Sequence, residues 1–543
     1  MTHPTAPDAE TPRVAGRPRV LVADPIAAEG IAVLRAVADV DECPGLSPER
    51  LAAAVADYDA LVVRSEARVT AAVIAAGTRL RVIARAGVGV DNIDVEAATR
   101  RGVAVINSPT GNIAAAAEHA IALLFALARH IPAANASLRD GRWERSRFVG
   151  TEIRGKTLGI VGLGKVGIEV ARRAGEGGLG MRLLAADPYA APDTARTLGV
   201  ELLSLDELLP QVDFLTVHTA LTAGTRGLIG ATELARLKTG ARIINCARGG
   251  VVDEPALLTA LDAGQVGGAA LDVFTAEPPA ADSPAGALIA HPRVVATPHL
   301  GASTEEAQVN VALDVAEQVA EVLRGGAARS AVNAPMILPE TLRQLQPWLA
   351  LVETLGRLYM QLHPGPLSRA ELTVSGEIAL ADTRPLAAAL VKGLLEPVSD
   401  AHVNLINAPL LAREWGLEIV ETRSPGSEQY ANLVSLRVGA SDAAEPHQLV
   451  ATIAWGAARV VRVDHYSTDF EPRGHILFCR NLDRPGMIGR VGGILGDAGV
   501  NISRMDVGPV AATDAAEGER VSGGEALMIL SVEGAVPAAT IER

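Results

Sequence analysis

Three residues of complementary chemistry follow apolar runs in the chain: Arg248 in NCARGGVVDE, Glu277 in DVFTAEPP and His299 in TPHLGAST. An imidazole has a suitable pKa to take a proton from a hydroxyl group as hydride leaves the same carbon. A carboxylate beside the imidazole orients it, and a guanidinium binds a substrate carboxylate through two parallel hydrogen bonds. Taken singly, these residues could be a surface ion pair, an exposed turn and a core histidine. As a set, they predict the interconversion of a 2-hydroxy acid and its keto acid.

The elements that must position this set are short apolar strands alternating with alanine-rich helical segments. From residue 19 onward the strand pattern occurs in RVLVAD, ALVVRS, LRVIARAG and VAVINSP, and later in TLGIVG, RLLAAD, FLTVHT, RIINCARG and AALDVF. Continuous apolar strands alternating with helices predict parallel sheets buried on both faces. An alanine-rich helix near residues 113–130 separates two such units, so we expect an α/β fold with two doubly wound, Rossmann-like lobes. The carboxyl edge of such a sheet collects the residues that follow its strands.

The segment TLGIVGLGKVGIEVARR predicts a dinucleotide site. It places Gly162, Gly164 and Gly167 between an apolar strand and a helix. Such glycines permit a tight turn and bring a pyrophosphate close to the helix N-terminus. The motif alone could be a loop glycine cluster, but strand, glycines and helix occur in the required order. The next strand ends at Asp187, whose carboxylate can accept from ribose hydroxyls and repels a 2′-phosphate, so NAD is expected rather than NADP.

Length and composition narrow the function classes. The 543 residues suggest about three or four domains. A net charge of −14 and an aromatic content of 3% argue against nucleic acid binding, and no apolar run reaches the roughly 20 residues of a membrane span. Cys43, Cys246 and Cys479 lie far apart with no CxxC spacing, and residues 1–18 contain no signal-peptide core. We therefore expect a disordered tail at 1–18 and a cytoplasmic location, and we assign no metal site.

The motifs GLGKVG, NCARGGVVDE, ALDVFTAEPP and TPHLGAST together resemble those of the D-isomer-specific 2-hydroxyacid dehydrogenase family, and residues 19–543 resemble its long-form members. The resemblance implies that Arg248 binds the substrate carboxylate and that Glu277 pairs with His299, the catalytic acid/base. It also implies that Asp272 contacts the nicotinamide carboxamide. The implied cofactor-binding residues are Gly162, Gly164, Lys165, Val166, Gly167, Asp187, His218, Thr219, Cys246, Ala247, Asp272 and Gly301.

Further cations indicate a phosphorylated substrate. A phosphate remote from the carboxylate requires additional Arg or Lys side chains. The family pattern places Arg64, Arg85 and Arg145 around that phosphate, with Arg145 contributed by a neighbouring subunit of a dimer or tetramer. Each arginine alone could be a surface residue; together, with the family motifs, they favour phosphate binding. The resemblance then implies NAD-dependent oxidation of 3-phospho-D-glycerate to 3-phosphohydroxypyruvate, the entry to L-serine synthesis. The implied substrate-binding residues are Arg64, Arg85, Gly87, Asn112 and Arg145.

The pattern changes after residue 330, where alternating stretches such as NLVSLRV and LVATIAW predict appended α+β modules. The resemblance implies four units: a substrate-binding domain (19–107 and 300–330), an NAD-binding Rossmann domain (108–299), an intervening domain (331–470) and a ferredoxin-type ACT regulatory domain (471–543).

The segment LDRPGMIGRVGGILGDAGVNI resembles the opening of an ACT domain. In serine-inhibited relatives, paired ACT domains bind L-serine at positions that match Asp483 and Asn501. The chain ends soon after EALMILSVEG. We therefore expect a shortened module with an exposed apolar sheet face, an unpaired strand edge and weak or absent inhibition by serine.

Two alternatives remain open at this point. One is another D-2-hydroxyacid dehydrogenase that acts on glycerate, hydroxypyruvate or phosphoerythronate. The other is an NAD-sensing protein resembling the transcriptional corepressors that share this fold. The acidic charge and the appended modules favour a metabolic enzyme over a corepressor.

Overall fold

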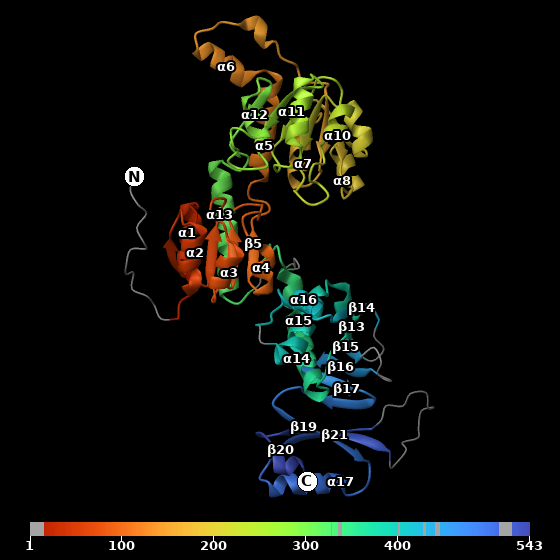
Figure 1. Ribbon diagram of the computed structural model, residues 1–543. Coiled ribbons are helices and arrows are strands. Elements are labelled where there is room, and N and C mark those ends of the chain that lie inside the picture. The colour runs from red at the N-terminus through yellow and green to blue at the C-terminus, as the bar shows by residue number, and fades with distance from the viewer. Residues whose placement is uncertain are drawn as a thin grey trace.

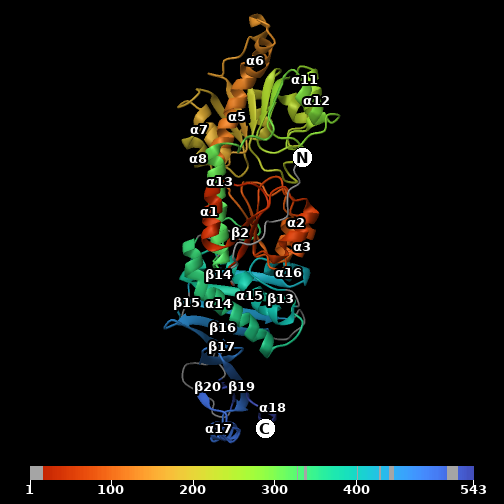
Figure 2. The ribbon, with the colours of Figure 1, turned by 90° about the vertical axis from the view of Figure 1, so that its left-hand side faces the viewer.

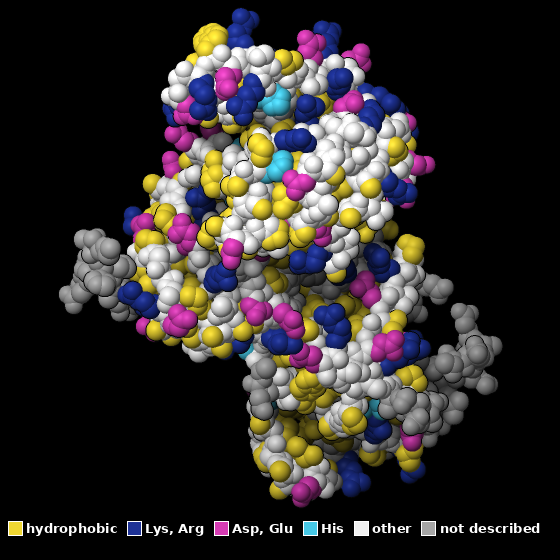
Figure 3. Space-filling model, turned by 45° about the horizontal axis from the view of Figure 1, so that its top comes forward, with side chains coloured by type: hydrophobic (Ala, Val, Ile, Leu, Met, Phe, Trp, Pro, Cys, Tyr) yellow, Lys and Arg dark blue, Asp and Glu magenta, His cyan; other side chains and the backbone are white. Residues whose placement is uncertain are grey.

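Four β-sheets follow one another along the chain, and Figures 1 and 2 show them spaced along an elongated molecule. Figure 3 shows acidic and basic side chains interspersed over the face that it presents. The lobe containing α7 and α11 lies at one end, and the small sheet of β19, β20 and β21 lies at the other. The expected tail falls outside the described residues, apart from 16–18. The computed structural model describes residues 16–326, 328–334, 339–399, 402–426, 430–439, 446–509 and 524–542.

The first sheet is parallel and has the strand order β2-β1-β3-β4-β5. Its apolar strands are buried on both faces: α1 and α13 cover one face, and α2 and α3 cover the other. The helix α13 follows the second lobe in the sequence but packs on the first lobe, so the chain returns to the first lobe after the second. The elements are β1 (Arg19–Val22), α1 (Ala28–Val37), β2 (Asp39–Glu42), α2 (Pro48–Ala54), β3 (Ala60–Val63), α3 (Ala71–Ala76), β4 (Val82–Arg85), α4 (Val95–Arg100), β5 (Ala104–Asn107) and α13 (Glu305–Leu323).

The second sheet is also parallel, in the order β12-β11-β10-β9-β6-β7-β8. Two apolar clusters fill its faces, and α5 and α7 pack together on one of them. The expected doubly wound lobes are therefore confirmed. The elements are α5 (Ile113–Ala128), β6 (Thr157–Val161), α7 (Lys165–Ala174), β7 (Arg182–Ala186), α8 (Pro192–Thr197), β8 (Val200–Leu202), α9 (Leu205–Leu208), β9 (Phe214–Val217), α10 (Ala231–Arg236), β10 (Ala241–Asn245), α11 (Glu254–Asp262), β11 (Val266–Leu271), α12 (Pro284–Ala290) and β12 (Val294–Ala296).

The helix α6 (Ile131–Arg139) projects from the second lobe (Figures 1 and 2). Within the described ranges, no single helix is long and apolar enough to cross a membrane. Only α5 and α6 taken together, bent by 61°, pass that test of length and composition.

The third sheet is mixed: β13 pairs in parallel with β14, and the remaining pairs are antiparallel in the order β14-β13-β15-β16-β17-β18. The helices α14 and α15 pack together and share one large apolar cluster with its strands. The elements are α14 (Pro339–Leu362), β13 (Arg369–Gly376), α15 (Arg384–Leu395), α16 (Ala408–Glu414), β14 (Glu418–Ser424), β15 (Asn432–Gly439), β16 (His447–Ala454), β17 (Ala457–Val463) and β18 (Tyr466–Phe470).

The small fourth sheet has the order β19-β21-β20. Leu527 and Ile529 of β21 belong to the apolar cluster of the third sheet, whereas Met528 and Leu530 pack with α17 on the opposite face. The apolar cluster of the third sheet covers one face of β21, and α17 covers the other. The expectation of an exposed apolar face is therefore wrong for this strand. The elements are β19 (His475–Leu482), α17 (Met487–Asp497), β20 (Ile502–Pro509), β21 (Glu525–Val532) and α18 (Ala538–Ile541).

Candidate active site

The three candidate catalytic residues follow neighbouring strands of the second sheet. Arg248 comes after β10, Glu277 after β11 and His299 after β12. Because these strands are parallel and adjacent, the residues come to one carboxyl edge, as the sequence predicts.

A short hydrogen bond joins His299 to Glu277. Nδ1 of His299 lies 2.7 Å from Oε2 of Glu277, and Oε1 of the same carboxylate accepts from the N–H of Phe274 at 3.0 Å. Burial would raise the pKa of Glu277, but the hydrogen bonds from His299 and Phe274 outweigh it and lower the pKa below its usual value. Glu277 is therefore an anion that orients the imidazole, and Nε2 of His299 has no hydrogen-bond partner among the described residues.

Asp272 is fully buried and holds the loop that carries His299. Its Oδ1 accepts from the N–H of Leu300 at 2.7 Å and from the hydroxyl of Thr297 at 2.6 Å, and its Oδ2 accepts from the N–H of Gly301 at 2.9 Å. The φ of His299 is +54°, in the left-handed region that a non-glycine residue seldom occupies. These hydrogen bonds fix the backbone on both sides of that residue.

His119 was missed by sequence reasoning. It lies on α5, and its Nε2 is 3.1 Å from Oδ1 of Asp272 and 3.2 Å from the hydroxyl of Thr297. Burial would raise the pKa of Asp272, but the hydrogen bonds from His119 and Thr297 outweigh it and lower that pKa. The available signal was a histidine in the alanine-rich helix, where a polar ring needs a buried partner.

Arg248 meets the first lobe. Its Nε lies 3.3 Å from Oδ2 of Asp91, and a Cβ on Gly89 would collide with its guanidinium. Asn245 at the end of β10 shapes this loop, because its amide donates to the carbonyl of Arg248 at 3.0 Å and its carbonyl accepts from the N–H of Ala247 at 3.0 Å. Asn245 is buried and was also missed by sequence reasoning.

Arg85 and Arg64 stand at the carboxyl ends of β4 and β3 in the first lobe. Nε of Arg85 donates to the carbonyl of Arg64 at 3.2 Å. Burial, together with the nearby positive charge of Arg248, lowers the pKa of Arg85 to about 10. The structure thus gathers three guanidinium groups at facing edges of the two lobes. Gly87 lies against Arg85, and Asn112 begins α5 without using its side chain as a cap.

The glycine motif leaves room for an anion. Gly162 has a φ of +94°, and a Cβ there would lie 2.8 Å from the carbonyl oxygen of His218, so only glycine fits. A Cβ on Gly167 would collide with the carbonyl of Gly162, which explains the close packing of α7. In contrast, a Cβ on Gly164 would meet no atom of the described residues within 4 Å. The start of α7 is therefore open at Gly164 and at the exposed Lys165, whereas Val166 packs against the apolar cluster beneath the helix.

The residues around this space suit a dinucleotide. Asp187 accepts from the N–H of Leu163 and of Tyr189 at 2.8 Å each, which places its carboxylate beside the glycine turn. Oγ1 of Thr219 is buried and has no hydrogen-bond partner among the described residues. An orphaned hydroxyl here fits a site whose ligand supplies the partner. Burial lowers the pKa of His218 to about 4 and raises that of the Cys246 thiol, so both side chains are neutral.

Three predicted residues lie away from this edge. Arg145 begins the short turn Arg145–Phe148 that follows α6 and is exposed. Asp483 follows β19, and Asn501 precedes β20; both side chains are exposed. Because β19 and β20 each pair antiparallel with β21, Asp483 and Asn501 stand at opposite ends of that sheet. One chain therefore does not bring Asp483 and Asn501 together.

Family models match three parts of the chain. The D-isomer specific 2-hydroxyacid dehydrogenase NAD binding domain matches residues 121–301, and the D-3-phosphoglycerate dehydrogenase intervening domain matches residues 344–464. The ACT domain matches residues 475–543.

Known proteins are similar to this chain in sequence or in structure. The D-3-phosphoglycerate dehydrogenase of Synechocystis is 45% identical over 96% of this chain and 91% of its own. That of Methanocaldococcus jannaschii is 43% identical over 97% of both chains. A solved structure of the TT0316 protein from Thermus thermophilus, with a TM-score of 0.53 and 36% identity, covers 58% of this chain and 99% of its own. The chain therefore belongs to the D-isomer-specific 2-hydroxyacid dehydrogenase family, among its long-form, NAD-dependent D-3-phosphoglycerate dehydrogenases.

Proposed function

We propose that the carboxyl edge of the second sheet oxidises the C2 hydroxyl of 3-phospho-D-glycerate to give 3-phosphohydroxypyruvate, with His299 as the base. The observation that carries this proposal is the pair of His299 and Glu277 at the sheet edge that also carries Arg248, whose charge acts on Arg85 of the other lobe. A base, its orienting carboxylate and an anion-binding group are the parts that this reaction requires.

In the proposed mechanism, Arg248 binds the substrate carboxylate through its guanidinium. Nε2 of His299 takes the proton of the C2 hydroxyl as the C2–H bond breaks, and a C=O bond forms. Glu277 stabilises the resulting imidazolium through its contact with Nδ1. NAD, when bound, supplies the acceptor for the hydride. In the reverse direction, protonated His299 returns the proton to the keto oxygen.

The residues that would hold NAD extend from the glycine turn along the carboxyl edge of the second sheet. Gly164 and the N-terminus of α7 would face the pyrophosphate, and Asp187 would accept from the ribose hydroxyls. His218, Thr219, Cys246, Ala247, Asp272 and Gly301 complete the proposed set.

A second copy of the chain would complete the substrate site. Arg64 and Arg85 are proposed to bind the phosphate, and Arg145, in the exposed turn that follows the projecting helix α6 (Figure 1), is proposed to join them from the other copy. Exposed apolar side chains on that segment support docking against another copy: Ile131, Leu138, Trp143 and Val149. We therefore propose a homo-oligomer. We also propose a cytoplasmic location. Each chain would consist of four units: 19–107 together with 300–330, then 108–299, 331–470 and 471–543.

We further propose L-serine as the effector of the small sheet. Asp483 offers a carboxylate for the amino group, and Asn501 offers an amide. Their places at opposite ends of the sheet support a site formed between two paired copies rather than within one.

NADH absorbance with a substrate panel tests the function. Turnover of 3-phosphoglycerate should exceed that of glycerate, because glycerate lacks the charge that Arg64 and Arg85 would bind. Equal turnover of glycerate, or a preference for 4-phosphoerythronate, would reassign the substrate within the family. NAD binding without turnover of any substrate would instead favour the corepressor-like alternative.

A further inference from the structure

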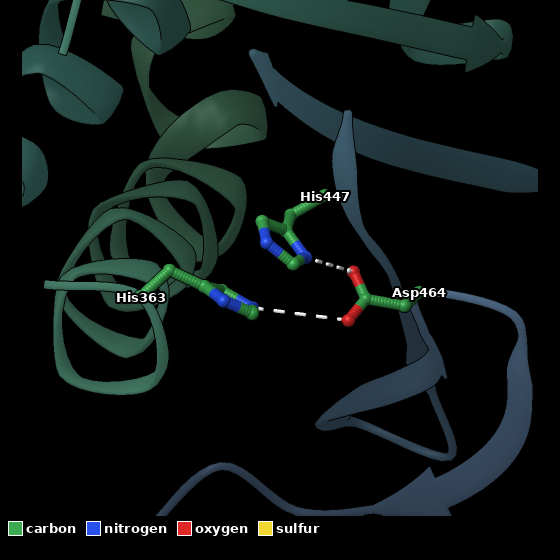
Figure 4. A group of neighbouring side chains, drawn as sticks. All are labelled: His363, His447 and Asp464. Atoms are coloured by element: carbon green, nitrogen blue, oxygen red, sulfur yellow. Dashed lines mark hydrogen bonds and ion pairs between the residues drawn. The ribbon is translucent and has the colours of Figure 1, made fainter. Parts of the chain in front are cut away.

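Two histidines and an aspartate meet in the module built on the third sheet, far from the proposed catalytic edge. His363 follows α14, His447 begins β16, and Asp464 lies in the turn between β17 and β18 (Figure 4). Their candidate ligand atoms all lie within 4.8 Å of one another. These residues are far apart in sequence, so no motif spacing reveals the cluster.

Both imidazoles turn toward the same carboxylate. Nδ1 of His447 is 3.1 Å from Oδ1 of Asp464, and Nε2 of His363 is 3.9 Å from Oδ2 (Figure 4). Oδ1 also accepts from the N–H of Gln448 at 3.0 Å, whereas Oδ2 accepts no hydrogen bond among the described residues. The carboxylate of Asp464 therefore faces a ring nitrogen of each histidine. The distance from Oδ2 to Nε2 of His363 is too long for a direct hydrogen bond.

The backbone and the ring packing hold these side chains in place. Asp464 has a φ of +49°, and its N–H donates to the carbonyl of Gln448 at 2.7 Å. The rings of His363 and His447 stack with centroids 3.5 Å apart, and the ring of Tyr359 packs at a tilt against that of His363. Two stacked imidazoles repel each other when both are protonated. Burial lowers the pKa of His363, and the charges of His447 and Arg480 lower it further against the opposing effect of Asp464.

We propose that His363, His447 and Asp464 bind one divalent transition-metal ion of the zinc class. Neutral imidazole and carboxylate are ligands that suit Zn²⁺ and its neighbours, whereas Mg²⁺ and Ca²⁺ prefer oxygen ligands alone. Zinc bonds are about 2.0–2.2 Å long, so the ligand atoms must close around the ion. Because the lone pair of an imidazole nitrogen lies in the ring plane, one of the two stacked rings must rotate out of the stack for both to bind the same ion. Water fills the remaining coordination positions. The negative charge of Asp464 offsets the repulsion from Arg480, which is exposed and therefore screened.

Such an ion would join three elements. It would link the end of α14 to the start of β16 and to the β17–β18 turn, close to the C-terminal sheet that carries Arg480. Because the ion would bind the folded chain and not the unfolded chain, it would raise the thermal unfolding midpoint of this module.

Titration of the chelator-treated full-length protein with CoCl₂ tests the site, because bound Co²⁺ has a visible absorption that reports its ligands. We expect saturation at one ion per chain, displacement by ZnCl₂ and an unfolding midpoint that rises with metal. Asp464→Asn, which tolerates the left-handed turn, and His447→Gln should each weaken binding by at least about 100-fold, since changing even the groups behind metal ligands costs 10–100-fold.

The exposed neighbour His465 supplies the matched control. His465→Gln should bind metal within about two-fold of the unaltered chain, because its side chain is not part of the cluster. Circular dichroism spectra recorded in the presence of chelator show whether each variant is folded without metal. If one of the two cluster variants is unfolded, His363→Gln is tested in its place. Absence of saturable Co²⁺ binding would overturn the proposal, as would binding that the cluster substitutions leave unchanged.

Discussion

The imidazole of His299 and the carboxylate of Glu277 lie 2.7 Å apart, from Nδ1 to Oε2, although they follow different strands of one sheet. Glu277 is itself fixed by the N–H of Phe274, and His299 by the hydrogen bonds of Asp272 to its following residues. The pair is thus oriented from both sides before any substrate binds. Preorganisation of this kind lets a base act without reorganising its surroundings.

His299→Ala should lower kcat by about 10²–10⁴, the usual contribution of a general acid or base. The measurement is steady-state NADH formation from 3-phosphoglycerate. His465→Gln is the control, because that exposed ring lies in another module. A near-normal kcat for His299→Ala would leave His299 as a structural residue.

Asp272→Asn should lower both kcat and the unfolding midpoint. An amide group in place of one carboxylate oxygen would face an N–H donor and leave it unpaired, at a cost of about 1–3 kcal/mol for a buried group. The KM for 3-phosphoglycerate should change little, because Asn245 rather than Asp272 shapes the Arg248 loop. A lower midpoint with unchanged kcat would show that Asp272 supports the fold without positioning His299.

The sequence predicted the lobes well because buried parallel strands are nearly continuous apolar runs. The strands β2 and β8 were missed: DVDE is mostly charged, and VEL has only three residues. Likewise, Arg248, Glu277 and His299 follow recognisable strands. His119, Asn245 and Asp91 act on them from distant segments or through backbone geometry, and no spacing in the chain encodes such contacts.

Asp91→Asn should lower the KM for 3-phosphoglycerate several-fold with little change in kcat. In the structure Asp91 pairs with Arg248 at 3.3 Å, so it competes with the substrate carboxylate. The pair is largely exposed at Asp91, and such pairs contribute up to about 1 kcal/mol, or roughly five-fold in affinity. Glu96→Gln on α4 is the charge-matched control. A higher KM would mean that Asp91 orients Arg248 rather than competing for it.

Asp187→Ala should relax the preference for NAD over NADP. The carboxylate stands beside the glycine turn, where it would repel a 2′-phosphate. The readout is the ratio of kcat/KM for the two cofactors. Asp193→Ala, on α8 in the same lobe, is the matched control because it removes one nearby surface charge. An unchanged ratio would assign the discrimination to another group.

His218→Gln should make the protein less sensitive to mild acid. Burial holds the pKa of His218 near 4, below its unfolded value of 6.5, so the unfolded chain takes up a proton between these values while the folded chain does not. This residue therefore costs no stability above pH 6.5, and stability is lost as the pH falls toward 4, by up to about 1.4 kcal/mol per pH unit.

Scanning calorimetry at pH 7 and pH 5 measures this effect. The unaltered chain should lose more of its unfolding midpoint between the two pH values than His218→Gln does, by an amount that corresponds to about 2 kcal/mol. His475→Gln, at an exposed site at the start of β19, should behave like the unaltered chain. Equal losses in the unaltered chain and in His218→Gln would show that His218 takes up its proton in the folded state, which requires an open path to water beside the cofactor loop.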